Sequence, residues 1–169
     1  MSKTNIIKTG KGVIKTEAEA VVALVDRIND QFEKAVCAII SCKGRLVVLG
    51  VGKSGLIAQK IAATMASTGT PSQFVHPGDA FHGDLGMITK NDIVLIISNS
   101  GETHELIQII PAIRNKKVHI IGMIGRGKST LYNSVDIVID TSVEKEACLL
   151  NLAPTSSTTA TLAMGDALS

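Results

Sequence analysis

Residues 46–55 read LVVLGVGKSG, and the fold class can be inferred from this stretch first. Four consecutive aliphatic residues predict a strand that is buried on both faces, as the strands of a parallel sheet are. The glycines that follow predict a tight turn. The residues from Ser54 to Ser67 predict a helix after that turn. The stretch is therefore typical of a strand–turn–helix unit in an α/β protein.

The same unit recurs along the chain. The expected strands span residues 46–49, 73–75, 92–98, 118–123 and 136–140. The expected later helices span residues 54–67, 103–115 and 129–133, and a last one runs to residue 169. Helical crossovers between parallel strands are right-handed. We therefore expect a doubly wound, five-stranded parallel sheet of flavodoxin-like order 2-1-3-4-5 in a three-layer αβα sandwich, with ligands bound beyond the carboxyl ends of the strands.

The amino-terminal part differs from the rest. Residues 1–15 show no periodicity, so we expect a flexible lead-in. Thr16 and Glu19 fit a capping box, and apolar residues at helical spacing follow, which predicts one long helix over residues 16–43. A chain of 169 residues suits one hydrophobic core, so residues 16–169 are expected to form a single domain.

Composition excludes several classes of protein. Aromatic residues are scarce and the net charge is only +2, which counts against a nucleic-acid partner. No apolar run approaches the roughly 20 residues that cross a membrane, and the amino terminus lacks a secretory signal. Cys37, Cys42 and Cys148 form no CxxC pair, so they are expected to be reduced thiols of a cytoplasmic protein.

The loop GVGKSG, residues 50–55, matches the dinucleotide-binding spacing G-x-G-x-x-G. The second strand does not end in the acid that would bind a ribose, and a Walker A motif would need glycine in place of Val47. What remains is a glycine turn that presents Lys53 and Ser54 at a helix amino terminus, a good anion site. The alternative is a plain turn with a surface lysine.

The second loop, SNSGET at residues 98–103, is more specific. Ser98, Ser100 and Thr103 provide three hydroxyl groups around the start of a helix. Neutral donors and the helix dipole suit a phosphate monoester that binds reversibly. The alternative is that one hydroxyl simply caps the helix.

Acidic and histidine residues complete the set of candidates. Glu102, Glu105 and Glu146 could supply the base that aldose–ketose isomerisation requires. His76 and His82 flank a glycine-rich loop, where they could bind a metal, contact a sugar or cap turns. Their spacing is weak evidence for zinc, so no metal site is predicted.

Four stretches, GVGKSG, HPGDAFHGDLGM, SNSGET and LAPTSSTTA, resemble the sugar-isomerase (SIS) domain of bacterial arabinose 5-phosphate isomerases. The resemblance covers the chain from about residue 17 to residue 169. It implies interconversion of D-ribulose 5-phosphate and D-arabinose 5-phosphate, the first step toward the Kdo sugar of lipopolysaccharide. It also implies a cytoplasmic homo-tetramer that needs no cofactor.

The resemblance also assigns roles. Lys53, Glu105 and Glu146 take the catalytic positions, with Lys53 neutralising charge on the carbonyl oxygen or enediolate. His82 matches a histidine that contacts the sugar. The residues implied to hold the phosphate are Ser54, Ser98, Asn99, Ser100 and Thr103.

The chain departs from the family pattern in two ways. Leu149 and Asn151 stand where members carry proline and glycine. Members also continue beyond residue 169, with a histidine implicated in proton transfer and, usually, two cystathionine-β-synthase-type (CBS) repeats. We therefore expect a domain truncated at its carboxyl end that binds its substrate but turns it over slowly.

Other functions stay open. One is an SIS isomerase of a hexose or heptose phosphate, which the HPGDAFHGDLGM loop disfavours. Another is a non-catalytic sensor of sugar phosphates, which could dispense with Lys53 and Glu146. A nicotinamide-dependent dehydrogenase is disfavoured by the missing ribose-binding acid.

Overall fold

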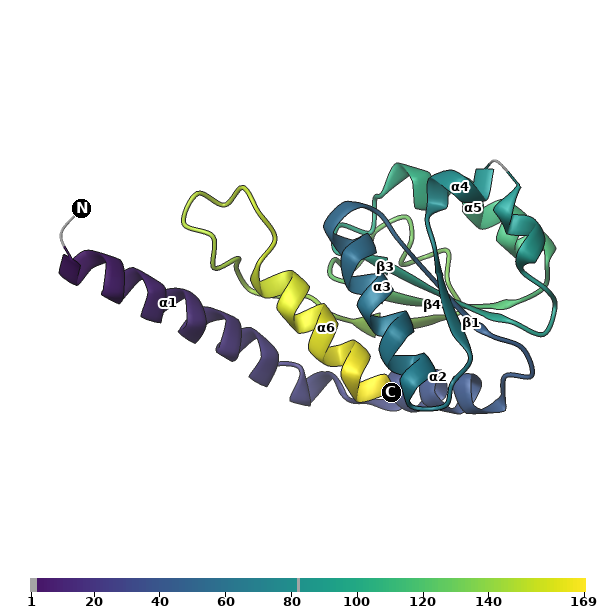
Figure 1. The fold of residues 1–169 in the computed structure, drawn as a ribbon, viewed down its shortest axis with the longest axis horizontal. Helices are drawn as coiled ribbons and strands as arrows, with labels where there is room; N and C mark the ends of the chain where they lie inside the picture. The colour runs from purple at the N-terminus through teal and green to yellow at the C-terminus, as the bar shows by residue number, and fades with distance from the viewer. Residues whose placement is uncertain (1–2, 82) are drawn as a thin grey trace.

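The computed structural model describes residues 3–81 and 83–169, and a five-stranded parallel sheet forms its centre (Figure 1). The strands are β1 Leu46–Gly50, β2 Ser72–Val75, β3 Ile93–Ser98, β4 His119–Ile124 and β5 Ile137–Asp140. Their order is β2-β1-β3-β4-β5, and every neighbouring pair is parallel. The predicted fold class and strand order are confirmed.

Helices cover both faces of the sheet. The helices are α1 Lys3–Val22, α2 Asp30–Ser41, α3 Gly52–Ser67, α4 Pro77–Phe81, α5 His104–Asn115 and α6 Ser156–Leu168, with 3-10 turns η1 Val25–Arg27 and η2 Asp84–Met87. Alternate strand residues enter opposite hydrophobic clusters: Leu46 and Val48 pack with α2, α3 and α6, whereas Val47 and Leu49 pack with α5. Because both faces of the central strands are buried, β1 and β3 are almost wholly aliphatic, which produced the sequence signal.

The expectation for the amino terminus is wrong. A helix, α1, spans Lys3–Val22 where a flexible lead-in was expected, and it packs along α6. Glu17 of α1 accepts a hydrogen bond from the Thr159 hydroxyl of α6 at 2.9 Å. The predicted single helix over residues 16–43 is divided, because Asn29 caps α2 by accepting a hydrogen bond from the Gln31 amide. The contact between α1 and α6 joins segments distant in sequence, so local periodicity does not reveal it. This contact accounts for the wrong expectation at residues 1–15.

The helix expected at residues 129–133 is also wrong, since this segment is a series of turns. The Ser129 hydroxyl donates to the Arg126 carbonyl, and the Asn133 side-chain amide donates to the Ser129 carbonyl at 3.1 Å. Side chains that bond to nearby backbone groups compete with helix formation, which explains the difference.

Two further expectations concern membranes and thiols. Among the helices of the described residues, none has both the length and the apolar character needed to span a membrane. The three cysteines, all within the described part of the chain, are free thiols.

Candidate active site

In the turn between β1 and α3, the backbone at the end of the strand packs directly against the backbone of the first turn of the helix. A Cβ atom at Gly50 would lie 2.8 Å from the Ser54 carbonyl oxygen, and one at Gly55 would lie 2.9 Å from the Gly50 carbonyl oxygen. Gly52 begins α3 with a φ of 58°, a conformation that favours glycine. The glycines therefore bring the start of α3 directly onto the end of β1. Lys53 is exposed there and Ser54 is half-buried.

The turn between β3 and α5 holds its hydroxyl groups differently. Ser98 is buried, and its hydroxyl lies 2.8 Å from the Thr103 hydroxyl and accepts the Gly101 amide at 3.0 Å. Ser100 is exposed and accepts the Glu102 amide at 3.1 Å. Asn99 beside it is also exposed. Ser98 therefore shapes the turn from inside, while the outer groups of the turn face solvent.

The two turns lie at the same edge of the sheet. In the pairing of β1 with β3, Gly50 is opposite Ile97, so the loops begin next to each other. This edge is the carboxyl end of both strands, where the strand order changes direction. Two helix amino termini, with their partial positive charge, meet there. The arrangement suits one anionic ligand held between the two turns.

Two glutamates of α5 and its turn have different surroundings. Glu105 is exposed in the first turn of α5, at the same edge as Lys53. Glu102 instead accepts the Thr130 amide at 2.8 Å. That hydrogen bond, helped by the charge of Arg126, holds the pKa of Glu102 below its ordinary value of 4.5. Of the two, Glu105 is the one whose carboxylate is available to a ligand.

Glu146 lies in the loop between β5 and α6. One of its oxygens accepts the Thr155 amide at 2.7 Å, the Thr155 hydroxyl at 3.1 Å and the Ser157 amide at 3.2 Å. Burial alone would raise the pKa of Glu146, but the hydrogen bonds from Ser157 and Thr155 outweigh it, and the pKa lies below 4.5. Glu146 therefore caps the amino terminus of α6 as an ionised carboxylate.

A cavity of about 460 Å³ lies between α1 and the loop that carries Glu146. Lys8 and Thr16 of α1 line it with Lys145 and Glu146, whereas Lys53 and Glu105 are not among its lining residues. Figure 1 shows this loop extending beyond the sheet, beside α1. The chain therefore places Lys53 and Glu105 at one edge of the sheet and gives Glu146 separate surroundings.

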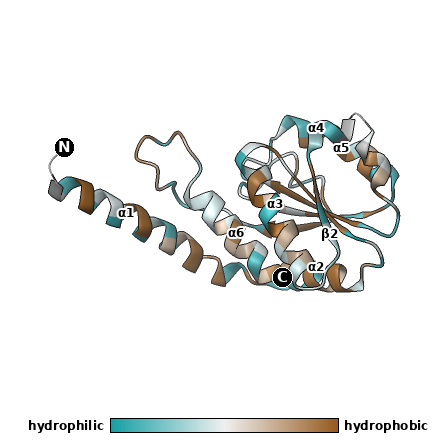
Figure 2. Ribbon diagram, viewed as in Figure 1, coloured by the Kyte–Doolittle hydropathy of each residue, from teal (hydrophilic) through white to brown (hydrophobic). Residues whose placement is uncertain are grey.

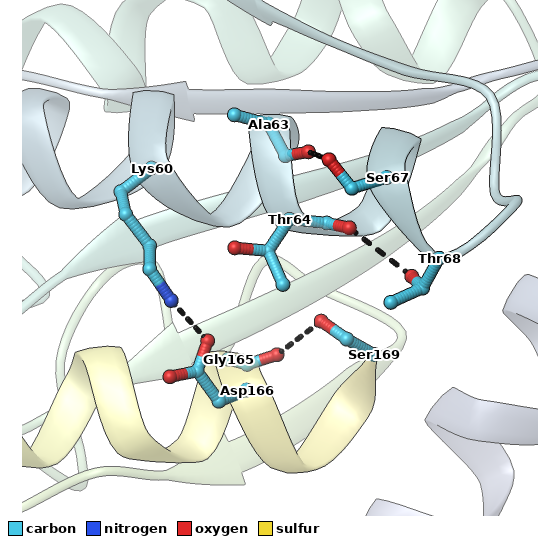
Figure 3. Close-up of polar contacts among 8 residues, drawn as sticks. All are labelled: Lys60, Ala63, Thr64, Ser67, Thr68, Gly165, Asp166 and Ser169. Atoms are coloured by element: carbon cyan, nitrogen blue, oxygen red, sulfur yellow. Dashed lines mark hydrogen bonds and ion pairs between the residues drawn. The ribbon is translucent and has the colours of Figure 1, made fainter.

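Helix α6 runs beside α3 in the same direction (Figure 1). A Cβ atom at Gly165 would lie 2.4 Å from the Ile61 side chain, so the two helices approach closely. Figure 3 shows the Lys60 ammonium paired with the Asp166 carboxylate next to this contact. Because α3 and α6 pack side by side in the same direction, the amino termini of both helices point toward the carboxyl edge of the sheet.

Of the two histidine candidates, only His76 lies within the described residues. His76 accepts the Gly78 amide on Nδ1 at 3.1 Å, which fits the turn-capping alternative. His82 lies outside the described residues. Within the described residues, no group of three or more His, Cys, Asp or Glu side chains is arranged to hold a metal ion.

Sequence reasoning missed the loop over residues 125–131 that follows β4. A Cβ atom at Gly125 would lie 2.0 Å from the Asn99 side-chain oxygen, and the Leu131 amide donates to the Gly101 carbonyl at 3.0 Å. The loop therefore packs against the 98–103 turn. A glycine immediately after the β4 strand was the available signal, because glycines also follow β1 and β3 at this edge.

Comparison with known proteins gives a consistent result. The SIS domain family model matches residues 39–169. Arabinose 5-phosphate isomerase KdsD of Pseudomonas aeruginosa is 52% identical over 164 residues, which are 97% of this chain and 50% of that protein. KdsD of Escherichia coli K12 is 52% identical over 161 residues, 95% of this chain and 49% of that protein. The chain thus spans about half the length of the curated relatives it matches.

A solved structure extends the comparison to three dimensions. It is that of Escherichia coli CFT073 c3406 in complex with arabinose 5-phosphate, which has a TM-score of 0.94 and 43% sequence identity. The match covers 99% of this chain and 89% of that chain.

Proposed function

The chain belongs to the SIS domain family, and on that basis we propose that it is an isomerase that interconverts D-ribulose 5-phosphate and D-arabinose 5-phosphate. One observation carries the proposal. The two anion-binding turns meet at the carboxyl edge of a sheet whose whole fold matches, at a TM-score of 0.94, a chain in complex with arabinose 5-phosphate. The identity of 52% to arabinose 5-phosphate isomerases supports it.

In this proposal the phosphate lies between the two turns. The exposed groups of Asn99 and Ser100, together with Thr103 and Ser54, face it, and the amino termini of α3 and α5 add their partial positive charges. Ser98 contributes from inside the turn, by fixing the Gly101 amide and the Thr103 hydroxyl. Neutral donors bind the phosphate reversibly. Turnover requires this, because the product must dissociate.

The chemistry then needs a base and a positive charge. Isomerisation moves a proton between C1 and C2, which are the carbonyl carbon and the carbon next to it. The intermediate is an enediolate. Glu105 is the proposed base, because it is exposed at the same edge as the phosphate turn. The Lys53 ammonium neutralises the charge that develops on the enediolate oxygen. His82 is the proposed contact to a sugar hydroxyl.

Glu146 has a more distant part in this proposal. Its carboxylate holds the start of α6, which packs beside α3, and in this proposal it does not remove the proton. A carboxylate whose pKa is held down is a weak base, which favours Glu105 for proton transfer. The reaction requires no cofactor or metal in this scheme. The product would feed the synthesis of Kdo in the cytoplasm.

We also propose that the chain assembles as a homo-tetramer. Large apolar side chains are exposed along α1 and in the loop before α6, and Figure 2 shows hydrophobic residues alternating with hydrophilic ones along α1 and a loop that is mostly hydrophobic in its outer part. They are Ile6, Ile7, Ile14, Val22, Leu149, Leu150 and Leu152. Exposed apolar patches on a folded chain are typical of subunit contacts. Light scattering at micromolar concentration tests this, and a monomer would overturn it.

The decisive experiment is NMR of ribulose 5-phosphate incubated with the 169-residue chain. Appearance of the anomeric proton signal of arabinose 5-phosphate supports the proposal. Conversion of only a hexose or heptose phosphate from a parallel panel would assign a different SIS isomerase. Tight binding of arabinose 5-phosphate without any turnover would instead indicate a sensor. Thermal stabilisation by NAD would point to the dehydrogenase alternative.

A further inference from the structure

The turn over residues 98–103 is interlocked with the loop over residues 125–131. Two backbone hydrogen bonds join them: the Gly125 amide donates to the Ser98 carbonyl at 3.2 Å, and the Leu131 amide donates to the Gly101 carbonyl at 3.0 Å. The contact is tight, since a Cβ atom at Gly101 would lie 1.9 Å from the Ser129 hydroxyl oxygen. The shape of the turn therefore depends on a loop that comes from the next strand of the sheet.

Glu102 adds a side-chain link to this interlock. Its Oε1 accepts the Thr130 amide at 2.8 Å, where the series of turns at residues 129–134 begins. Ser100, the preceding hydroxyl residue, accepts the Glu102 amide at 3.1 Å. Glu102 is thus tied at its backbone to the turn and at its carboxylate to the loop. The Glu102 side chain is exposed, so burial does not hold it in place. The hydrogen bond from the Thr130 amide holds it instead.

The charge of Glu102 makes this placement significant. A carboxylate beside a phosphate site would repel a dianionic ligand. In the structure, the loop amide of Thr130 and the charge of Arg126 both act on this carboxylate. The carboxylate is therefore engaged by the loop rather than left free beside Ser100 and Thr103.

From this geometry we propose that Glu102 is a positioning residue for the phosphate turn: it fastens the turn to the 125–131 loop and keeps its own charge on the loop side. The inference rests on the proposed function, because it assumes that the 98–103 turn binds the phosphate. Glu102 takes no part in proton transfer. Its effect is on the affinity for the sugar phosphate.

The test compares Glu102→Ala with Glu102→Gln. Glutamine keeps an oxygen that can accept the Thr130 amide, whereas alanine removes it. Glu33→Ala is the matched control, because Glu33 is an exposed glutamate on α2. Affinity for arabinose 5-phosphate is measured by calorimetry, turnover by NMR, and exchange of the Thr130 amide with deuterium by NMR. Thermal melting confirms that each variant folds.

We expect Glu102→Ala to bind arabinose 5-phosphate about 2- to 12-fold more weakly, the range of one lost hydrogen bond. Its kcat stays within about 2-fold of the wild type, since binding alone is affected. The Thr130 amide exchanges faster in Glu102→Ala only, and Glu102→Gln binds like the wild type or more tightly.

Three results would overturn the inference. Wild-type affinity in Glu102→Ala would remove the positioning role. Tighter binding in both Glu102 variants would show that the carboxylate only repels the ligand. A wild-type chain that binds no arabinose 5-phosphate would overturn the proposed function, and this inference with it.

Discussion

The carboxylate of Glu146 lies 2.7 Å from the backbone nitrogen of Thr155 and closes the loop between β5 and α6 onto the start of that helix. Two more donors, the Thr155 hydroxyl and the Ser157 amide, reach the same oxygen. Glu146, a candidate catalytic residue, therefore also holds a helix terminus. The two roles make separable predictions, because capping affects stability and hydrogen exchange while catalysis affects only turnover.

Glu146→Ala is expected to destabilise the chain by about 1 kcal/mol, the usual cost of a lost helix cap. The loss follows because the amides of Thr155 and Ser157 lose their acceptor. Urea denaturation measures it, and hydrogen exchange should localise faster opening to the start of α6. Glu144→Ala, an exposed neighbour, is the control. Equal stability of the two variants would contradict the capping role.

The same carboxylate predicts a pH dependence. The pKa of Glu146 is lowered in the folded chain, so its contribution to stability is full above the ordinary value of 4.5. It is lost as the pH falls through the lowered pKa, because the protonated group caps the helix less well. Urea denaturation midpoints are measured from pH 7 down to pH values well below 4.5. As the pH falls, the midpoint should decrease less steeply in Glu146→Gln than in the wild type. Parallel curves would refute this assignment.

Ser98→Ala and Ser100→Ala separate the inside of the 98–103 turn, the proposed phosphate site, from its outside. Ser98 is buried and accepts the buried Gly101 amide, so its loss should cost about 1–3 kcal/mol of stability as well as phosphate affinity. Ser100 is exposed, so its loss should weaken binding by about 2- to 12-fold and leave stability nearly unchanged. Thermal melting with calorimetric binding measures both. A stable Ser98→Ala variant with wild-type affinity would contradict the assignment.

The sheet was predictable because its signal is local. The central strands β1 and β3 are short aliphatic runs, and burial on both faces requires that composition. The order of the strands followed from the handedness of the crossovers. The boundaries of β1, β3 and β4 fell within one residue of the expectation, since glycine or polar residues end each run.

The error at the amino terminus has a different cause from the two local ones, namely contact between segments distant in sequence. Helix α1 is ordered along α6, with Glu17 bonded to Thr159, and nothing near residue 17 in the sequence predicts that partner. The site shows the same division. The GVGKSG and SNSGET turns could be predicted, whereas the cap made by Glu146 and the interlock between Gly101 and Ser129 depend on long-range packing.

Gly165→Ala and Gly12→Ala should change stability in opposite directions. Alanine favours a helix over glycine by about 1 kcal/mol, so Gly12→Ala should stabilise α1, where a Cβ atom has no neighbour within 4 Å. At Gly165 the Cβ would lie 2.4 Å from Ile61, and overpacking of about 1–3 kcal/mol should outweigh the gain. Thermal melting decides, and a stabilised Gly165→Ala would show that α3 and α6 can separate at little cost.

Lys53→Ala and Glu105→Gln test the chemical step. Both residues are exposed at the carboxyl edge of the sheet, and neither contributes to the core, so both variants should fold. Removing a positioned base costs about 10²- to 10⁴-fold in rate, and removing a charge that stabilises an enediolate costs about 10²- to 10³-fold.

Glu105→Gln should therefore lower kcat for ribulose 5-phosphate by about 10²-fold or more while the affinity for arabinose 5-phosphate changes by less than about 3-fold, because the phosphate contacts are intact. Lys53→Ala should lower kcat similarly and also weaken binding, since its ammonium attracts the phosphate as well. Glu33→Gln is the matched control, because Glu33 and Glu105 are both exposed glutamates in the first turn of a helix. NMR of the two sugar phosphates measures the rates. If Glu105→Gln kept the wild-type rate, Glu146 would become the candidate base, and its lowered pKa would then have to rise when the substrate binds.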